Sequence, residues 1–125
     1  MREFFIISIG AALGANARYF LTLWFVKRYG ATFPWGTLVI NVSGSFAIGL
    51  ILTILGQRLV SEPGARLLLV TGFLGAYTTF SAFSYETLAL LQQGAYPEAA
   101  YNVLSSVALS LFAAFAGILL ARLIT

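Results

Sequence analysis

Apolar residues form four long runs along the chain, separated by short polar connections. The runs are Phe4 to Val26, Trp35 to Leu55, Leu67 to Leu91 and Ala99 to Ile124. Each is long enough for an α-helix to cross about 30 Å of hydrocarbon, which takes roughly 20 residues. The connections carry the Gly and Pro residues that are typical of turns. The pattern therefore predicts an all-α membrane protein in which residues 1–125 form one domain of four transmembrane helices.

Composition supports this class and excludes several functions. The chain is 60% hydrophobic and 9% charged, whereas soluble domains average about 45–50% apolar and about 25% charged residues. It has no Cys and no His, which excludes disulfides, thiolate or imidazole metal sites and catalysis by either side chain. Neither a nucleophile with an adjacent base nor a phosphate-loop motif occurs, so we do not expect an enzyme. The net charge of +3 is spread over the ends of the apolar runs, which favours membrane-surface anchoring over binding of nucleic acid.

The distribution of basic residues bears on orientation in the membrane. Four crossings place both termini on one side, and four basic residues are expected there: Arg2, Arg58, Arg66 and Arg122. Two are expected on the opposite side: Lys27 and Arg28. Glu3 and Glu62 lie on the richer side. A four-to-two bias sets orientation only weakly, so insertion in both orientations, or dual topology, remains open.

One tripeptide resembles a signal-peptidase site. Ala15-Asn16-Ala17 has the small-x-small form. Glu3 cancels the positive charge that such a leader needs at its start, and the apolar run resumes at Tyr19. We therefore expect the segment to be retained as the first membrane helix.

The third run has an unusual content of polar and flexible residues at its centre. Gly72 and Gly75 loosen the backbone, and four hydroxyl residues follow that can cap interrupted hydrogen bonds: Thr78, Thr79, Ser81 and Ser84. We therefore predict a helix broken near the membrane centre. A break frees backbone carbonyls, which can coordinate a hard cation such as Na⁺, as in transporters with broken helices.

Three residues after the predicted break have two interpretations each. Phe80 and Phe83 are three residues apart and share a helix face, and their electropositive ring edges could contact an anion; phenylalanine in a membrane helix also commonly faces lipid or core. Glu86 lies about two turns from the end of the run and either faces water or contributes a polar group to a pore.

The other runs also carry polar residues. Arg18 either extends to the headgroups or attracts anions in a water-filled vestibule. Asn41, one turn before Ser45, either joins neighbouring helices or donates its amide to an anion. The fourth run has a one-sided stripe that either lines a pore or bonds its own backbone: Asn102, Ser105, Ser106 and Ser110.

Small residues at helical spacing predict close helix packing. Gly10 and Gly14 lie on one line of the first helix, and Ser45 and Gly49 on one line of the second. Such pairs are also common in membrane helices through composition alone. Because four helices barely enclose an interior, we expect several of the polar residues to face a second subunit.

At these residues the sequence resembles the small bacterial fluoride channels known as Fluc or CrcB, over the whole chain. The resemblance rests on Gly14-x-x-x-Arg18, on Trp35-Gly36-Thr37-Leu38 with Asn41 and Gly44, and on the third run. There it covers Thr71-Gly72-Phe73-Leu74-Gly75, Thr78-Thr79-Phe80-Ser81-x-Phe83-Ser84 and Glu86.

The resemblance implies an antiparallel homodimer in the bacterial cytoplasmic membrane, with two fluoride pores along the dimer interface. It implies a structural Na⁺, not transported, held by the backbone carbonyls of Gly75 and Thr78 in both subunits. It also implies a fluoride pathway and a vestibule arginine at Arg18. The pathway residues expected are Asn41, Phe80, Phe83, Ser81, Ser84, Tyr101 and Ser105, and Glu86 stays a candidate for a further polar group of the pore.

The chain departs from the family pattern at three positions. Ala76 replaces a frequent glycine and stiffens the predicted break, and Ala82 replaces a frequent hydroxyl between the two phenylalanines. Leu109 stands one turn after Ser105, where relatives can carry a hydroxyl, and Ser106 or Ser110 could substitute for it.

The sequence-based hypothesis is a passive, fluoride-selective channel that exports fluoride and relieves its toxicity. One rival is a small proton-coupled multidrug exporter, which needs a central membrane carboxylate, and Glu86 is the only candidate. The other rival is a non-transporting subunit of a membrane assembly, which requires a partner protein.

Overall fold

The computed structural model describes residues 1–57 and 63–125, all in helices and short connections. Three helices are continuous: α1 (Arg2–Tyr29), α2 (Trp35–Gln57) and α6 (Tyr96–Ile124). The third crossing is assembled from four shorter elements: α3 (Pro63–Arg66), the π-helical η1 (Leu67–Leu74), α4 (Gly75–Tyr77) and α5 (Phe80–Gln92). Arg58 and Glu62, which contribute to the expected charge bias, lie outside the described residues.

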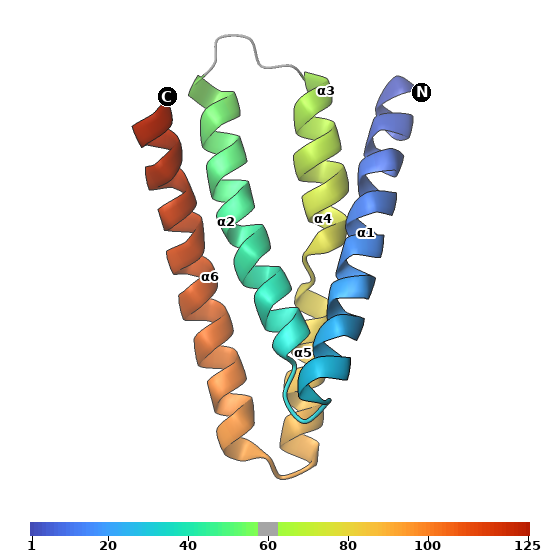
Figure 1. Ribbon diagram of the computed structural model, residues 1–125, viewed down its shortest axis with the longest axis vertical. Coiled ribbons are helices and arrows are strands. Elements are labelled where there is room, and N and C mark those ends of the chain that lie inside the picture. Colours follow the sequence, from blue (N-terminus) through green and yellow to red (C-terminus); the bar gives the residue numbers. More distant parts are fainter. Residues whose placement is uncertain (58–62) are drawn as a thin grey trace.

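Four helical stretches are long and apolar enough to cross a membrane, which confirms the predicted spans. They are Arg2–Tyr29, Trp35–Gly56, Pro63–Gln92 and Tyr96–Ile124. Both termini lie at the same end of the molecule, as four crossings require (Figure 1). The protein is therefore a multi-pass membrane protein.

The helices extend beyond the apolar runs at several ends. α1 includes Lys27 and Arg28, because basic side chains interact favourably with the carboxyl end of a helix dipole. α6 begins at Tyr96 rather than Ala99, with Pro97 in its first turn, where a missing amide hydrogen costs nothing. Gly30 and Gly94 follow α1 and α5 with φ of 81° and 75°, a left-handed conformation that glycine adopts easily.

Glycines bring the helices into backbone contact in two places. A methyl group added to Gly14 would collide with the carbonyl of Phe73, so α1 lies directly on η1. Gly49 faces Ala114, and Gly117 faces the carbonyl of Phe46, which holds α2 against α6 in the same way. The small-residue lines predicted for the first two helices therefore mark real close approaches in the fold.

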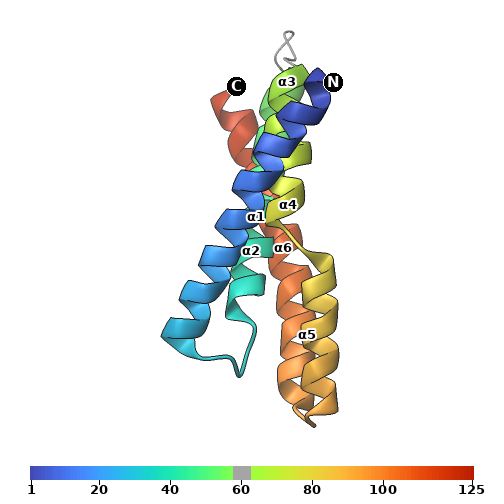
Figure 2. The same ribbon diagram turned by 90° about the vertical axis from the view of Figure 1, so that its right-hand side faces the viewer.

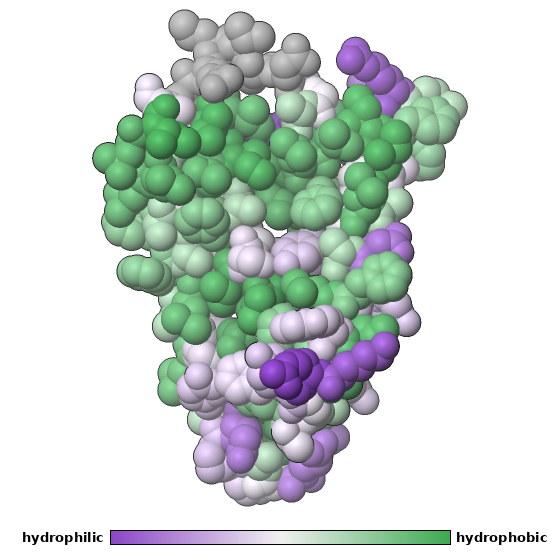
Figure 3. Space-filling model, viewed as in Figure 1, coloured by the Kyte–Doolittle hydropathy of each residue, from purple (hydrophilic) through white to green (hydrophobic). Residues whose placement is uncertain are grey.

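Large apolar side chains cover the outside of the bundle. Figure 3 shows them over most of one face, with hydrophilic residues gathered toward the lower end and near the N-terminus. Side chains such as Phe4, Phe112 and Leu123 are more than half exposed. Such a surface suits lipid or another apolar partner, because in water it would be costly.

Candidate functional site

The third crossing is interrupted between α4 and α5. Thr78 and Thr79 have extended backbones, with φ and ψ of −80° and 158° for Thr78 and −154° and 115° for Thr79. The chain steps sideways there before α5 begins at Phe80 (Figure 2). Extended residues inside an apolar span need hydrogen-bond partners outside their own helix.

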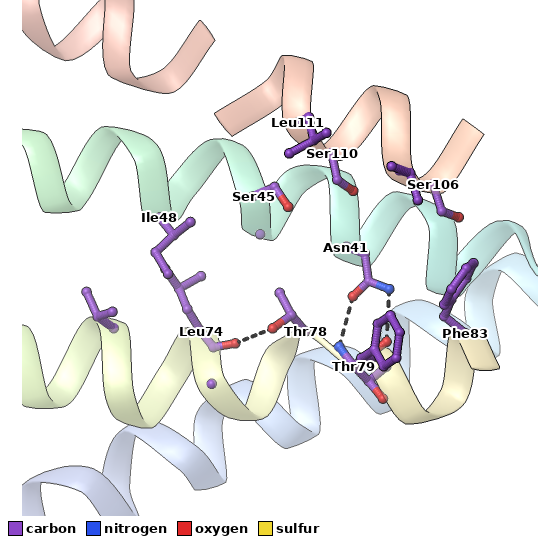
Figure 4. Close-up of a pocket in the computed structure, with 15 residues that line it drawn as sticks. Asn41, Ser45, Ile48, Leu74, Thr78, Thr79, Phe83, Ser106, Ser110 and Leu111 are labelled. Carbon is purple, nitrogen blue, oxygen red and sulfur yellow. Dashed lines mark hydrogen bonds between the residues drawn. The ribbon is translucent and has the colours of Figure 1, made fainter. Parts of the chain in front are cut away.

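Asn41 on α2 provides those partners for Thr79. Its Nδ2 donates to the Thr79 carbonyl at 2.9 Å, and its Oδ1 accepts from the Thr79 amide at 2.8 Å (Figure 4). The side chain thus pairs with both backbone groups, as a neighbouring β-strand would. Because Nδ2 carries two hydrogens, this pair uses only one of them.

The hydroxyls of Thr78 and Thr79 form hydrogen bonds with backbone groups of the two helix ends beside the interruption. Thr78 Oγ1 donates to the Leu74 carbonyl at 3.0 Å, back into the preceding turn. Thr79 is the N-cap of α5, and its Oγ1 accepts from the Ala82 amide at 3.1 Å. Threonine at this position is a favourable cap, because it pairs one of the free amides at the start of a helix.

Two amides at the interruption consequently donate to side chains rather than to carbonyls four residues earlier. In a continuous helix, the Thr79 amide would bond the Gly75 carbonyl, and the Ala82 amide would bond the Thr78 carbonyl. Here Thr79 donates to Asn41, and Ala82 donates to the Thr79 hydroxyl. The Gly75 and Thr78 carbonyls are therefore deprived of the amides that a regular helix would give them.

A cavity of about 470 Å³ lies beside the interruption, lined by α2, η1, α4, α5 and α6. Its polar lining comes chiefly from Asn41, Ser45, Thr78, Thr79, Ser106 and Ser110 (Figure 4). None of its lining residues carries a charge. An ion in this cavity would therefore be stabilised by amide, hydroxyl and ring dipoles rather than by a countercharge.

Two phenylalanines contribute to the wall of this cavity. Phe80 and Phe83 both line it, with ring centroids 5.5 Å apart and planes tilted by 48°. The Phe80 side chain is 79% exposed, so the cavity opens at the surface of the single chain. Gly44 faces the methyl group of Thr78, with which an added methyl group would collide.

Glu86 lies away from this cavity, in a second pocket of about 190 Å³ bordered by the α1–α2 connection. Its Oε1 accepts from Thr37 Oγ1 at 2.8 Å. Its Oε2 is buried without a hydrogen-bond partner among the described residues. The carboxylate therefore ties α5 to α2.

A further polar tie joins α5 to α6. Asn102 is 1% exposed, and its Nδ2 donates to Thr87 Oγ1 at 2.9 Å. Ser106 Oγ in turn donates to Asn102 Oδ1 at 3.4 Å. In the predicted stripe on α6, Asn102 and Ser106 thus form a buried tie, and Ser106 and Ser110 line the cavity.

Comparison with known proteins identifies the family. A family model described as CrcB-like protein, Camphor Resistance (CrcB), matches residues 5–118. The chain belongs to the CrcB family.

Two relatives named fluoride-specific ion channel FluC, from Roseiflexus sp. (strain RS-1) and Solibacter usitatus, are each 49% identical to it. The matches cover 94% and 96% of this chain and 95% and 98% of the relatives. A third FluC, from Rhizobium meliloti (strain 1021), is 43% identical over 98% of both chains. The sequence-based recognition of the family is confirmed.

In this CrcB chain, five of the expected ion-site residues meet at the cavity. Asn41, Gly75, Thr78, Phe80 and Phe83 all line it, although they come from two crossings. This part of the family pattern is therefore brought together by the fold.

Other expected site residues lie outside the cavity of this single CrcB chain. Ser81 pairs with the Thr79 hydroxyl at 3.2 Å, and Ser84 bonds the Phe80 carbonyl at 2.9 Å. Ser105 bonds its own helix at the Tyr101 carbonyl, at 2.6 Å. Tyr101 is 52% exposed, and its ring lies 5.4 Å from that of Phe33.

Two more positions complete the comparison with the family pattern. Arg18 is half-buried on α1 and does not line the cavity. Leu109, which departs from the family pattern, is 45% exposed, whereas its neighbours Ser106 and Ser110 line the cavity.

Two hydroxyl partners could not be identified from the sequence. Thr37 stands in the Trp35-Gly36-Thr37-Leu38 motif and Thr87 directly follows Glu86, and in the structure they bind Glu86 and Asn102, respectively. The one signal in the sequence was that a carboxylate and an amide inside apolar runs each require a partner. Nothing local identified which residue that partner would be.

Proposed function

We propose that the protein is a fluoride-selective channel that lets fluoride leave the cell passively across the cytoplasmic membrane. The observation that carries the proposal is the near full-length identity, 43–49%, to relatives named fluoride-specific ion channels. A negative-inside potential of 100 mV favours exit of each anion by about 2.3 kcal/mol. No coupling to another energy source is therefore needed.

The cavity chemistry supports an anion as the permeating species. Fluoride is small and strongly hydrated, so a narrow route must replace its water with hydrogen-bond donors. Among the described residues, the Nδ2 hydrogen of Asn41 beyond its pair with Thr79, the hydroxyl of Ser110, and the ring edges of Phe80 and Phe83 are donors or positive dipoles of this kind. A neutral lining also lets an ion leave again, because it holds the ion less tightly than a fixed cation would.

We assign the remaining expected residues to the same pathway as part of this proposal. Ser81, Ser84, Tyr101 and Ser105 would extend the polar route beyond the cavity once a second subunit is present. Arg18 would attract anions into the vestibule, and Glu86 would contribute a polar group farther along α5.

The interruption of the third crossing, proposed to lie near the membrane centre, suits a structural Na⁺. The carbonyls of Gly75 and Thr78 are hard oxygen donors of the kind that Na⁺ binds in broken helices. Their usual amide partners are redirected to Asn41 and to the Thr79 hydroxyl, which fits this role. Bound there, the positive ion would attract the carbonyls of both subunits and so hold their two third crossings together.

The open cavity supports an antiparallel homodimer. Phe80 is mostly exposed in the single chain, although it lines the cavity. A second copy, inserted with the opposite orientation, would cover this face and enclose two pores. The weak charge bias of the sequence permits both orientations.

Fluoride efflux from liposomes tests the proposal directly. Purified protein in liposomes loaded with potassium fluoride should release fluoride when valinomycin carries the compensating potassium. Liposomes loaded with chloride should release little. Absence of fluoride release, or chloride release of equal size, would contradict the proposal.

A further inference from the structure

Helix α5 carries Phe83, yet few elements hold it in place. It runs beside α6 below the interruption and packs mainly against that helix (Figure 2). Its attachment to α2 includes the Asn41–Thr79 pair at its start and the Thr37–Glu86 bond near its middle. The position of Phe83 in the cavity therefore depends on how α5 is fixed to α6.

A line of hydrogen bonds connects α6 to the backbone of Phe83. Asn102 Nδ2 donates to Thr87 Oγ1 at 2.9 Å, and Thr87 Oγ1 donates to the Phe83 carbonyl at 2.8 Å. A hydroxyl has one hydrogen and two lone pairs, so it can make both bonds at once. Ser106, which lines the cavity with Phe83, donates to the other end of Asn102. The line thus begins and ends at residues of the cavity.

Burial makes this tie strong. Asn102 is 1% exposed, Ser106 is 8% exposed and Thr87 is half-buried, so little water reaches the Asn102 end of this line. In surroundings of low polarity a hydrogen bond is strengthened, and an unpaired polar group becomes costly. Sliding or rotating α5 along α6 would break the Asn102–Thr87 bond, which opposes that movement.

We propose that Thr87 and Asn102 are positioning residues for ion permeation. Asn102 on α6 donates to the Thr87 hydroxyl and so fixes α5 one turn beyond Phe83. This bond thereby holds the Phe83 ring in the cavity. Phe83 and Thr87 are four residues apart and lie on one face of α5. This inference rests on the proposed function, since it assumes that Phe83 contacts the permeating fluoride.

The test compares variants of Thr87 in the full-length protein, by fluoride efflux from liposomes. Thr87→Val keeps the shape of the side chain and removes the hydroxyl. We expect it to slow fluoride efflux by about tenfold or more, as misplacement of a single contacting group can do. Thr87→Ser keeps the hydroxyl and should recover most of the flux lost in Thr87→Val.

Thr53→Val is the matched control. The Thr53 hydroxyl makes the same bond to the carbonyl four residues earlier, at Gly49 and 2.7 Å, but it lies on α2 away from the tie. This variant should conduct like the unaltered chain. A loss equal to that of Thr87→Val would point to a general effect of removing helix hydroxyls and would overturn the proposal.

A combination with Phe83→Leu separates positioning from general weakening of the fold. If Thr87 acts through Phe83, adding Thr87→Val to Phe83→Leu should slow efflux little further. If the two losses multiply instead, Thr87 acts independently of Phe83 and the proposal is wrong. Efflux in Thr87→Val equal to that of the unaltered chain, or in Thr87→Ser as slow as in Thr87→Val, would also overturn it.

The double variant Thr87→Val with Asn102→Leu distinguishes a loss of positioning from a failure to fold. Replacing both partners of a buried hydrogen bond by apolar groups can be nearly neutral for stability, whereas removing one partner is costly. Asn102→Leu also removes the acceptor of the Ser106 hydroxyl, but a helical serine can donate instead to the backbone carbonyl four residues earlier. The double variant should therefore fold and still conduct slowly. Normal flux in it, or failure to fold while Thr87→Ser folds, would overturn the proposal. Lack of fluoride efflux in the unaltered protein would instead contradict the proposed function.

Discussion

Asn41 shows how one side chain can serve both the fold and the site. It pairs with both backbone groups of Thr79 and still has one amide hydrogen beyond that pair. The two roles that the sequence left open, joining neighbouring elements and donating to an anion, are therefore compatible. The first is seen in the structure, and the second belongs to the proposed function.

Asn41→Leu should weaken both the fold and the flux. It leaves the amide and carbonyl of Thr79 without their partners, and each buried unpaired group costs about 1–3 kcal/mol. We expect a lower unfolding temperature in detergent, followed by circular dichroism, and slower fluoride efflux. Asn16→Leu is the control, since the Asn16 amide bonds only the Ala12 carbonyl of its own helix among the described residues. Equal unfolding temperatures in the two variants would contradict this account.

Glu86→Gln distinguishes the channel from a proton-coupled exporter. A glutamine oxygen still accepts the hydrogen bond from Thr37, so the tie between α5 and α2 should survive. We expect a substantial fluoride flux in liposomes carrying this variant. Complete loss of transport would favour the exporter, because such a mechanism depends on a carboxylate that binds and releases protons.

At the scale of the elements, glycine contacts set how closely the helices approach the site. Gly44 lets α2 lie against the interruption, because its missing side chain leaves room for the Thr78 methyl group. That contact brings Asn41, one turn earlier on α2, within reach of Thr79. The interruption and α2 therefore form one packed unit.

Gly44→Ala should disturb this unit. The added methyl group would collide with Thr78 Cγ2, and overpacking of this kind costs about 1–3 kcal/mol. Thermal unfolding in detergent should show the loss. Adding Thr78→Ser should restore stability, because serine removes the methyl group and keeps the hydroxyl. Gly56→Ala is the control, since a methyl group at Gly56 meets nothing within 4 Å; equal destabilisation by both alanines would contradict the prediction.

At the scale of the whole molecule, the outer surface and the open cavity point to a membrane and to a second copy. Apolar side chains cover much of the bundle (Figure 3), and the cavity opens beside the exposed Phe80. The proposed antiparallel dimer requires the same sequence to insert in both orientations. Its weak charge bias is the physical basis for that requirement.

Cysteine labelling measures the orientation. The chain has no native cysteine, so Gln92→Cys, an exposed position at the end of α5, introduces a single thiol. We expect a membrane-impermeant maleimide to label about half of the molecules in intact cells, because dual insertion places this end on either side. Labelling of nearly all molecules, or of nearly none, would contradict dual topology.

Much of the fold was predictable from the sequence, because the relevant signals are local. The four apolar runs predicted the four spans, and Gly14 and Gly49 marked close helix contacts. Helix ends were less accurate, since capping by Pro97 and the helix dipole near Lys27 extend helices past their apolar residues. The motif residues predicted the family, which the comparisons confirm.

The sequence by itself determined that polar groups inside apolar runs must find partners, because hydrocarbon provides none. Only the tertiary structure decided which partners they find. Thr37 reaches Glu86 across 49 residues of chain, Asn41 reaches Thr79 across 38, and Asn102 reaches Thr87 across 15. Such pairs depend on how the helices cross and approach one another, and no local pattern of residues specifies that geometry.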